Sequence, residues 1–91
     1  MSKYVVEHIK WVDSAGNASW TSVAEVLRDK LKLIESVGFV LNETDDCVVI
    51  VGNIDEAQDD EHMTHIAHHM FIPKVAIKSR TVITEIDVSG N

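Results

Sequence analysis

The chain has 91 residues, of which 45% are hydrophobic and 25% are charged. This is the composition of one globular domain, and it excludes a disordered segment or several domains. Fifteen acidic residues against eight basic ones give a net charge of −7. That charge opposes generic nucleic-acid binding, because cations must displace the counterions of phosphate groups. The single cysteine, Cys47, excludes an intramolecular disulfide and indicates a reducing compartment.

The sequence carries no pattern of a targeting signal, a membrane span or a cofactor site. The longest apolar runs are four or five residues, so we expect a cytoplasmic protein that does not enter membranes. The glycine-rich patterns that hold nucleotide phosphates are absent. No carboxylate stands in an apolar context that would raise its pKa for acid–base chemistry. We therefore expect no enzyme activity and no cofactor.

The first half of the chain predicts a strand, a helix and a second strand. Residues 4–12 are rich in β-branched and aromatic side chains, which predicts a strand, and residues 13–19 have turn composition. Ser22 and Glu25 form a capping-box pattern, so a helix should begin near Ser22. Trp20, just before this cap, is expected to pack back onto the core. Apolar residues then recur at helical spacing, at Val23, Val26, Leu27, Leu31 and Ile34.

Residues 36–54 predict a β-hairpin whose turn is the sequence NETDD, with Asp45 and Asp46 as turn formers. Gly38 lies within the first strand, which indicates a bend or a close backbone approach. The returning strand, CVVIV, is apolar on both faces and should be covered on both sides.

The last third predicts a loop and two more strands. Residues 55–69 are acidic and then rich in histidine, which predicts a variable loop. The sequence MFIPKVAI predicts two short strands broken at Pro73, and KSRTVITEIDV continues as a strand. The expected fold is mainly β with one helix (α+β) in the single domain 1–91, and the short strands predict a small bent five-stranded barrel or a strongly bent sheet.

Four histidines lie within ten residues, at positions 62, 65, 68 and 69. On a helix, His62, His65 and His69 would share a face and could bind zinc, with Asp59 or Glu61 as a carboxylate ligand. The spacing matches no established zinc motif, and no cysteine pair accompanies it. The alternative is a solvated polar loop, or histidines along a rim between subunits, with no metal.

The basic residues outside the helix concentrate in PKVAIKSR, residues 73–80. Lys74, Lys78 and Arg80 could contact phosphates, although no aromatic residue between them offers a surface for base stacking. The alternative is that these lysines discourage unwanted pairing of an edge strand.

Two segments together resemble the second half of a Sm-like barrel. VGFVLNETDDCVVIVGNI is similar to its glycine-bearing strand, Asp hairpin and apolar strand, and HHMFIPKVAIKSR to its two short strands at a tight corner. FIPKVAI resembles the Y-K-H-A-I segment of the bacterial RNA chaperone Hfq, with Val75 in place of the histidine and Pro73 in place of the tyrosine. DDCVV resembles the D-x-F-V segment, with Asp45 at the aspartate. The chain also resembles small phage-type proteins through Trp11, Asp13, Trp20, Ser36–Phe39 and Ile72–Lys74.

The resemblance implies a ring of identical subunits that pair through their edge strands, in the cytoplasm of an infected host cell if the protein is phage-encoded. It also implies binding of RNA or single-stranded DNA, with Lys74, Lys78 and Arg80 on phosphates and Asp45 shaping the adjoining loop. A protein-interaction or assembly module without nucleic-acid binding remains the alternative, which the acidic charge favours. A metal-binding module through the histidines is the third hypothesis.

Overall fold

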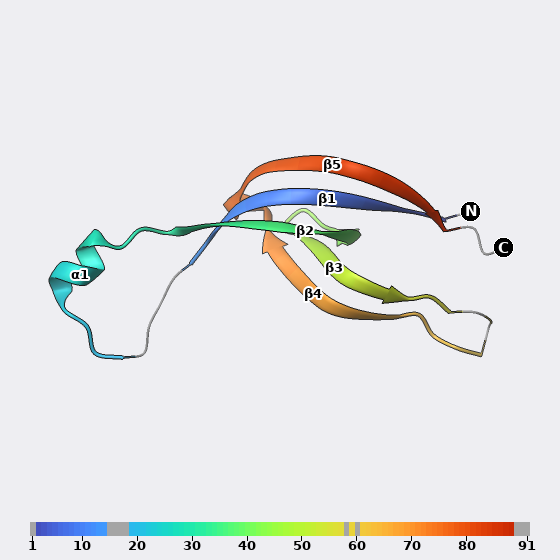
Figure 1. The fold of residues 1–91 in the computed structure, drawn as a ribbon, viewed down its shortest axis with the longest axis horizontal. Coiled ribbons are helices and arrows are strands. Elements are labelled where there is room, and N and C mark those ends of the chain that lie inside the picture. Colours follow the sequence, from blue (N-terminus) through green and yellow to red (C-terminus); the bar gives the residue numbers. More distant parts are fainter. Residues whose placement is uncertain (1, 15–18, 58, 60, 89–91) are drawn as a thin grey trace.

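A computed structural model describes residues 2–14, 19–57, 59 and 61–88. Within these described residues, five strands, one short α-helix and one 3-10 turn follow one another (Figure 1). Their bounds are β1 Ser2–Asp13, α1 Val23–Arg28, β2 Lys32–Glu43, β3 Cys47–Asp55, β4 His65–Pro73, η1 Lys74–Ala76 and β5 Ile77–Val88. The expectation of a mainly β protein with one helix is confirmed.

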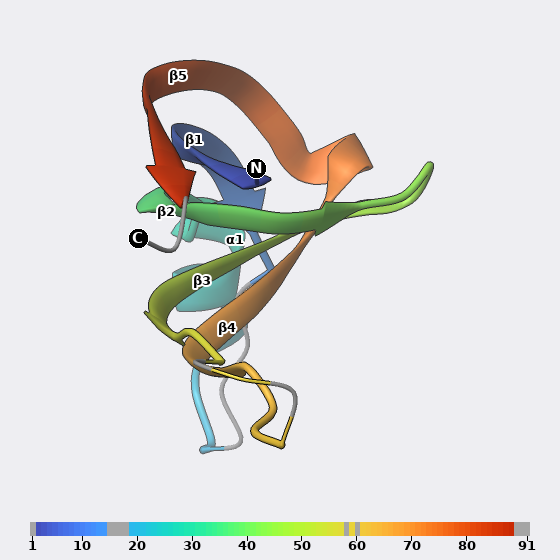
Figure 2. The ribbon, with the colours of Figure 1, turned by 90° about the vertical axis from the view of Figure 1, so that its right-hand side faces the viewer.

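The five strands form one antiparallel sheet in the order β4-β3-β2-β1-β5. The strands curve strongly, and the β3–β4 hairpin diverges from β1 and β5 (Figures 1 and 2). The sheet is nevertheless open, because β4 pairs only with β3 and β5 only with β1 within the described part of the chain. The expected closed barrel is therefore not what this single chain forms: both outer edges carry backbone groups without a partner strand.

The core gathers around β3, which has a paired strand along each of its edges. Its main cluster consists of Ile9, Trp11, Val48, Ile50 and Ile72. Val49 and Val51, whose side chains alternate with these on β3, are also buried. The prediction that CVVIV is covered on both faces is thus confirmed, as expected for a central strand. The indole nitrogen of Trp11 donates to Ser36 Oγ at 3.0 Å, so this large side chain is buried without an unsatisfied donor.

Gly38 allows β2 and β3 to bend tightly against each other. A Cβ atom at this position would lie 2.9 Å from the carbonyl oxygen of Val51 and 3.3 Å from Cβ of Ile50. Contacts this short are not tolerated without movement of the backbone. The prediction of a close approach at Gly38 is confirmed, and it explains how the sheet can curve at its centre.

The helix is shorter than its apolar spacing predicted. It begins as expected, because Ser22 Oγ accepts the N–H of Glu25 at 3.1 Å. It ends at Arg28, however, and β2 starts at Lys32. The predicted helical positions of Leu31 and Ile34 were wrong, since Leu31 lies between α1 and β2, and Ile34 belongs to β2 and pairs with Trp11 of β1. Tertiary pairing has overridden a local helical pattern.

Trp20 was expected to pack onto the core, and this prediction was also wrong. Its side chain is fully exposed, and α1 contains no buried residue. The helix stands apart from the sheet, at the end of the molecule away from the N-terminus (Figure 1). The physical reason is distance: β1 and β2 extend past the buried cluster, so the segment that connects them lies too far from the core to pack on it (Figure 1).

The turns follow their sequence signals. The NETDD segment closes the β2–β3 hairpin between Glu43 and Cys47, and Pro73 ends β4 before the η1 corner leads into β5. In the hairpin, Thr44 Oγ1 accepts the backbone N–H groups of Asp46 and Cys47, each at 3.2 Å. Both predicted chain reversals are confirmed.

One residue of β4 has a backbone conformation that disfavours its side chain. His68 has a φ of 59°, in the left-handed region. We expect His68→Gly to raise the free energy of unfolding by up to about 1 kcal/mol, because glycine adopts this conformation without a steric cost. Urea denaturation measures the change. His65→Gly on the same strand is the control and should instead lower stability, by about 0.5–1 kcal/mol. A loss of stability in His68→Gly would contradict the strain argument.

Candidate functional site

The basic segment 73–80 lies at the corner between β4 and β5, next to the β2–β3 hairpin. The backbone N–H of Lys74 donates to the carbonyl oxygen of Asp46 at 2.8 Å, which ties the corner to the hairpin. The Lys74 ammonium lies 2.8 Å from a carboxylate oxygen of Glu43 at the end of β2. The fold therefore brings the predicted phosphate-binding residues close to the turn that contains Asp45, but it places a carboxylate among them.

Arg80 occupies the centre of this group of charges. Its Nε and Nη2 donate to the two carboxylate oxygens of Glu7 at 2.7 and 2.9 Å. Its Nη1 and Nη2 also donate to Glu43 at 3.1 and 2.9 Å. Arg80 thus makes two bidentate ion pairs, the geometry in which a guanidinium binds carboxylates most strongly. We call Glu7, Glu43, Lys74 and Arg80 the charge clamp.

The charge clamp joins β1, β2, the η1 corner and β5. Glu7 comes from β1 and is only 7% exposed, because it lies on the strand face that also carries buried Ile9. The two carboxylates, first Glu7 and then Glu43, raise the pKa of Arg80, so the guanidinium stays charged. Hydrogen bonds from Arg80 and then Lys74 lower the pKa of Glu43 to about 2. Two cations and two anions balance in this group, which leaves little charge for a phosphate.

The other two residues proposed for nucleic-acid binding lie outside the clamp. Lys78 is exposed and forms no ion pair with a described residue. Asp45 is exposed in the hairpin turn, whose hydrogen bonds come from Thr44 rather than from the Asp45 side chain. Of the three predicted phosphate contacts, the structure therefore brings together Lys74 and Arg80, and both already bind carboxylates.

The histidines do not form the shared helical face that a zinc site would need. His65, His68 and His69 belong to β4, and only His62 lies in the loop before it. The expected boundary of the loop at residue 69 was wrong, because β4 pairs with β3 from the register pair of His65 with Asp55 onward. The ring of His69 packs edge-on against Phe71, with centroids 5.8 Å apart.

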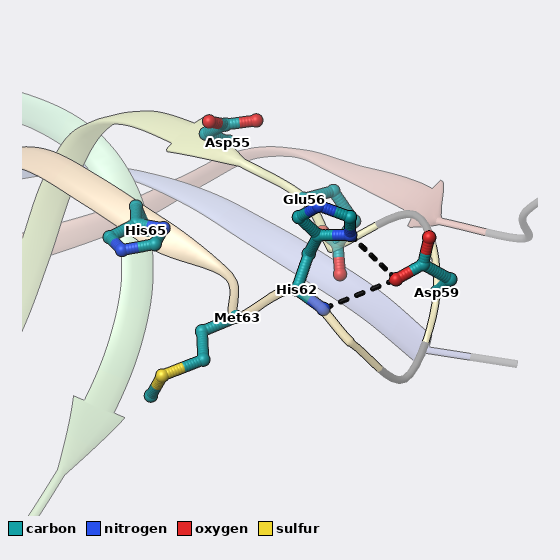
Figure 3. Close-up of a pocket in the computed structure, with 6 residues that line it drawn as sticks. All are labelled: Asp55, Glu56, Asp59, His62, Met63 and His65. Atoms are coloured by element: carbon teal, nitrogen blue, oxygen red, sulfur yellow. Dashed lines mark hydrogen bonds and ion pairs between the residues drawn. The ribbon is translucent and has the colours of Figure 1, made fainter.

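A shallow pocket forms where β3 leads into this loop (Figure 3). His62 Nδ1 lies 2.6 Å from Asp59 Oδ1, and this contact lowers the pKa of Asp59. Asp55, Glu56, Met63 and His65 complete the lining. His65 and Asp55 are directed away from the His62–Asp59 pair (Figure 3). Within the described residues, no group of three histidine, cysteine or carboxylate side chains is arranged to hold a metal ion.

Comparisons with known proteins identify no relative. No family model, no curated protein and no solved structure matches the chain. None of the described helices has the length and apolar character needed to span a bilayer.

Two members of the charge clamp, Glu7 and Glu43, were not predicted from the sequence. No carboxylate was singled out as lying in an apolar context, yet Glu7 is buried beside Ile9 and paired with Arg80. The available signal was strand parity, since Glu7 shares the face of Val5, Ile9 and Trp11 in the predicted first strand. A charged side chain on an apolar face requires a buried partner of opposite charge. Glu43 had no comparable signal, because it stands beside a polar turn.

The lowered pKa of Glu43 predicts how acid acts on the protein. A carboxylate whose pKa is lower in the folded state stabilises the fold above its unfolded pKa, and this stabilisation is lost as pH falls towards the folded pKa. Glu43→Gln should therefore be less stable than wild type near neutral pH, and the difference should vanish between pH 4.5 and about 2. Urea midpoints across this range measure it. Glu61→Gln, in the exposed loop, serves as control. A difference independent of pH would contradict the assignment.

Proposed function

We propose that this protein is a self-assembling, Sm-like module that forms a homo-oligomeric ring and acts in protein assembly. The observation that supports it is the pair of unpartnered sheet edges, both of which carry exposed apolar side chains. Phe71 on β4 is 63% exposed, and Ile83 on β5 is 54% exposed. Long apolar edges of this kind favour pairing with another chain. Pairing of β4 in one subunit with β5 in the next would continue the sheet from subunit to subunit, and repetition of this contact would close it into a ring.

The details of β5 support an intermolecular role. Ile83 is the extra residue of a bulge, because Val6 pairs with Thr84 while Glu7 pairs with Val82. Val82 and Ile86 are exposed as well, whereas Ile77 at the start of the strand packs against the core, so most of the apolar side chains described on β5 stay uncovered. A small domain that leaves much apolar surface uncovered gains stability from a partner chain.

The charge clamp favours assembly over nucleic-acid binding. A phosphate that contacts Lys74 or Arg80 must compete with Glu43 and Glu7, which already hold both cations in ion pairs. Of the three predicted phosphate contacts, only Lys78 has no ion pair with a described residue. Binding of RNA or single-stranded DNA is the second candidate, since a ring would repeat Lys78 around an axis and add weak contacts as avidity. Metal binding through the histidines has no supporting geometry among the described residues.

Analytical ultracentrifugation tests the assembly proposal. Wild type should sediment at several times 10.1 kDa. Phe71→Lys combined with Ile83→Lys should shift it to smaller species, because lysines on edge strands oppose pairing. Val75→Lys is the control, since Val75 is 98% exposed but lies in η1 rather than on an edge strand. A wild-type monomer at micromolar concentration would refute the proposal.

A binding assay with labelled single-stranded RNA and DNA distinguishes assembly alone from the second candidate, nucleic-acid binding. Assembly without nucleic acid predicts no binding of RNA or DNA at about 50 mM salt, where electrostatic contacts are least screened. Salt-sensitive binding by wild type that Lys78→Ala abolishes would establish the nucleic-acid function instead.

A further inference from the structure

The segment 19–33 forms an arm whose apolar side chains have no cover. It contains α1 and the start of β2, and the side chains of its large apolar residues are exposed, namely Trp20, Val23, Val26, Leu27, Leu31 and Leu33. The helix of 6 residues is too short to be stable by itself in water. A contiguous apolar surface of this kind on a marginal helix indicates a binding partner.

The arm also differs in charge from the rest of the molecule. It carries three of the chain's eight basic residues, Arg28, Lys30 and Lys32, against two carboxylates, Glu25 and Asp29. The whole chain has a net charge of −7. The arm is therefore a basic and apolar segment on an acidic protein, and its complement is an acidic surface with an apolar floor.

Such a surface lies at the opposite end of the same molecule. There, a shallow hollow of about 260 Å³ is lined by Tyr4, Phe39, Ile54 and Ile86, with Glu56 and Asp87 beside them. Asp55, Glu56 and Asp59 line the neighbouring pocket of Figure 3, which shares Glu56 with this hollow. We call the hollow and these residues the acidic end. Figure 1 shows α1 at one extreme of the long axis and the ends of β3 and β5 at the other.

We propose that the arm of one copy binds the acidic end of a second copy, head to tail. The molecule is 59 Å long, so an arm at one extreme does not reach the hollow of its own chain. Trp20 or Leu27 would enter the apolar hollow, while Arg28, Lys30 and Lys32 face the carboxylates. Such a contact uses a different patch on each partner, so repetition builds a larger closed or open assembly. It needs no backbone pairing at either sheet edge, although Ile86 and Asp87 of the hollow belong to the edge strand β5.

A second copy is favoured over an anionic membrane as the partner. A basic segment with a tryptophan suits both in principle. The carboxylates of the acidic end and the overall charge of −7 repel an anionic bilayer, whereas they attract the arm of a neighbouring chain.

The test uses the full-length chain carrying Phe71→Lys and Ile83→Lys, which removes the edge contacts from the measurement. This chain should still associate, more weakly at high salt, in sedimentation velocity. Trp20→Ser with Leu27→Ser should weaken association at least about 10-fold, since buried aromatic anchors dominate interfaces. Ile86→Ser with Asp87→Lys, at the acidic end, should weaken it similarly. Val75→Ser, which removes an equally exposed apolar side chain outside both surfaces, should have no effect.

Mixing the two defective variants gives the decisive result. Each keeps one intact surface, so a mixture should form one-to-one dimers at concentrations where neither variant associates measurably alone. Association that survives the acidic-end changes would show an arm-to-arm contact and overturn the proposal. So would a monomer at every accessible concentration of the edge-blocked chain, or arm-dependent binding to anionic vesicles without self-association. Failure of edge pairing alone would leave the arm-dependent association in place.

Discussion

Arg80→Ala is expected to lower the free energy of unfolding by about 3 kcal/mol, the lower end of the range for removing one partner of a buried ion pair, because Glu7 is buried but the Arg80 side chain is 28% exposed. The reason is Glu7, whose side chain is only 9% exposed and whose ion pair is with Arg80. Without the guanidinium, the carboxylate must lose its charge or be buried without a counterion. Urea denaturation of the purified variant measures the loss.

Two further variants separate this cause from a general effect of removing a charge. Lys78→Ala, on the same strand, removes an exposed cation without an ion pair and should change stability by less than about 0.5 kcal/mol. The double variant Glu7→Leu with Arg80→Met removes both charges together, and it should recover much of the loss. A loss below about 1 kcal/mol in Arg80→Ala would show that the clamp does not stabilise the fold.

Gly38→Val is the second substitution with a large expected effect. Its Cβ would lie 2.9 Å from the Val51 carbonyl oxygen, and the atom it meets is backbone rather than the end of a flexible side chain. Forcing extra atoms into a packed site costs about 1–3 kcal/mol and sometimes more. We expect a loss of about 3 kcal/mol, measured by thermal and urea denaturation.

Gly52→Val provides a matched control within the same sheet. A Cβ there would meet His68 Cβ at 3.3 Å, which is close but involves a side chain on an edge strand. The loss should be clearly smaller than that of Gly38→Val. Equal effects at both glycines would mean that strand propensity, rather than the close approach at Gly38, governs the change.

Local patterns predicted those elements whose environment is also local. The Ser22 cap, the NETDD turn, the break at Pro73 and the buried strand CVVIV all depend on residues next to one another in sequence. The residue at which α1 ends and the residue at which β4 begins depend instead on strand partners that are distant in sequence. Ile34 has helical spacing with Leu27 and Leu31, but it pairs with Trp11 across the sheet. His65 stands in a polar segment, yet it pairs with Asp55.

The candidate site was predicted only in part for the same reason. Composition identified Lys74, Lys78 and Arg80 as the basic residues of the corner. It could not show that Glu7, more than seventy residues from Arg80, would reach the same point. Ion-pair partners brought together by strand order are determined by topology, and a single sequence does not reveal topology directly.

The pairing of β1 with β5 also has a consequence for how the chain folds. The β2–β3 hairpin has a short connection, between Glu43 and Cys47, and hairpins of this kind form within microseconds. The β1–β5 ladder joins Ser2 to Val88, so it must close a far longer stretch of chain. We therefore expect β5 to dock after this hairpin, with the Arg80–Glu7 pair formed late. Weakening that pair should then accelerate unfolding while leaving the folding rate nearly unchanged.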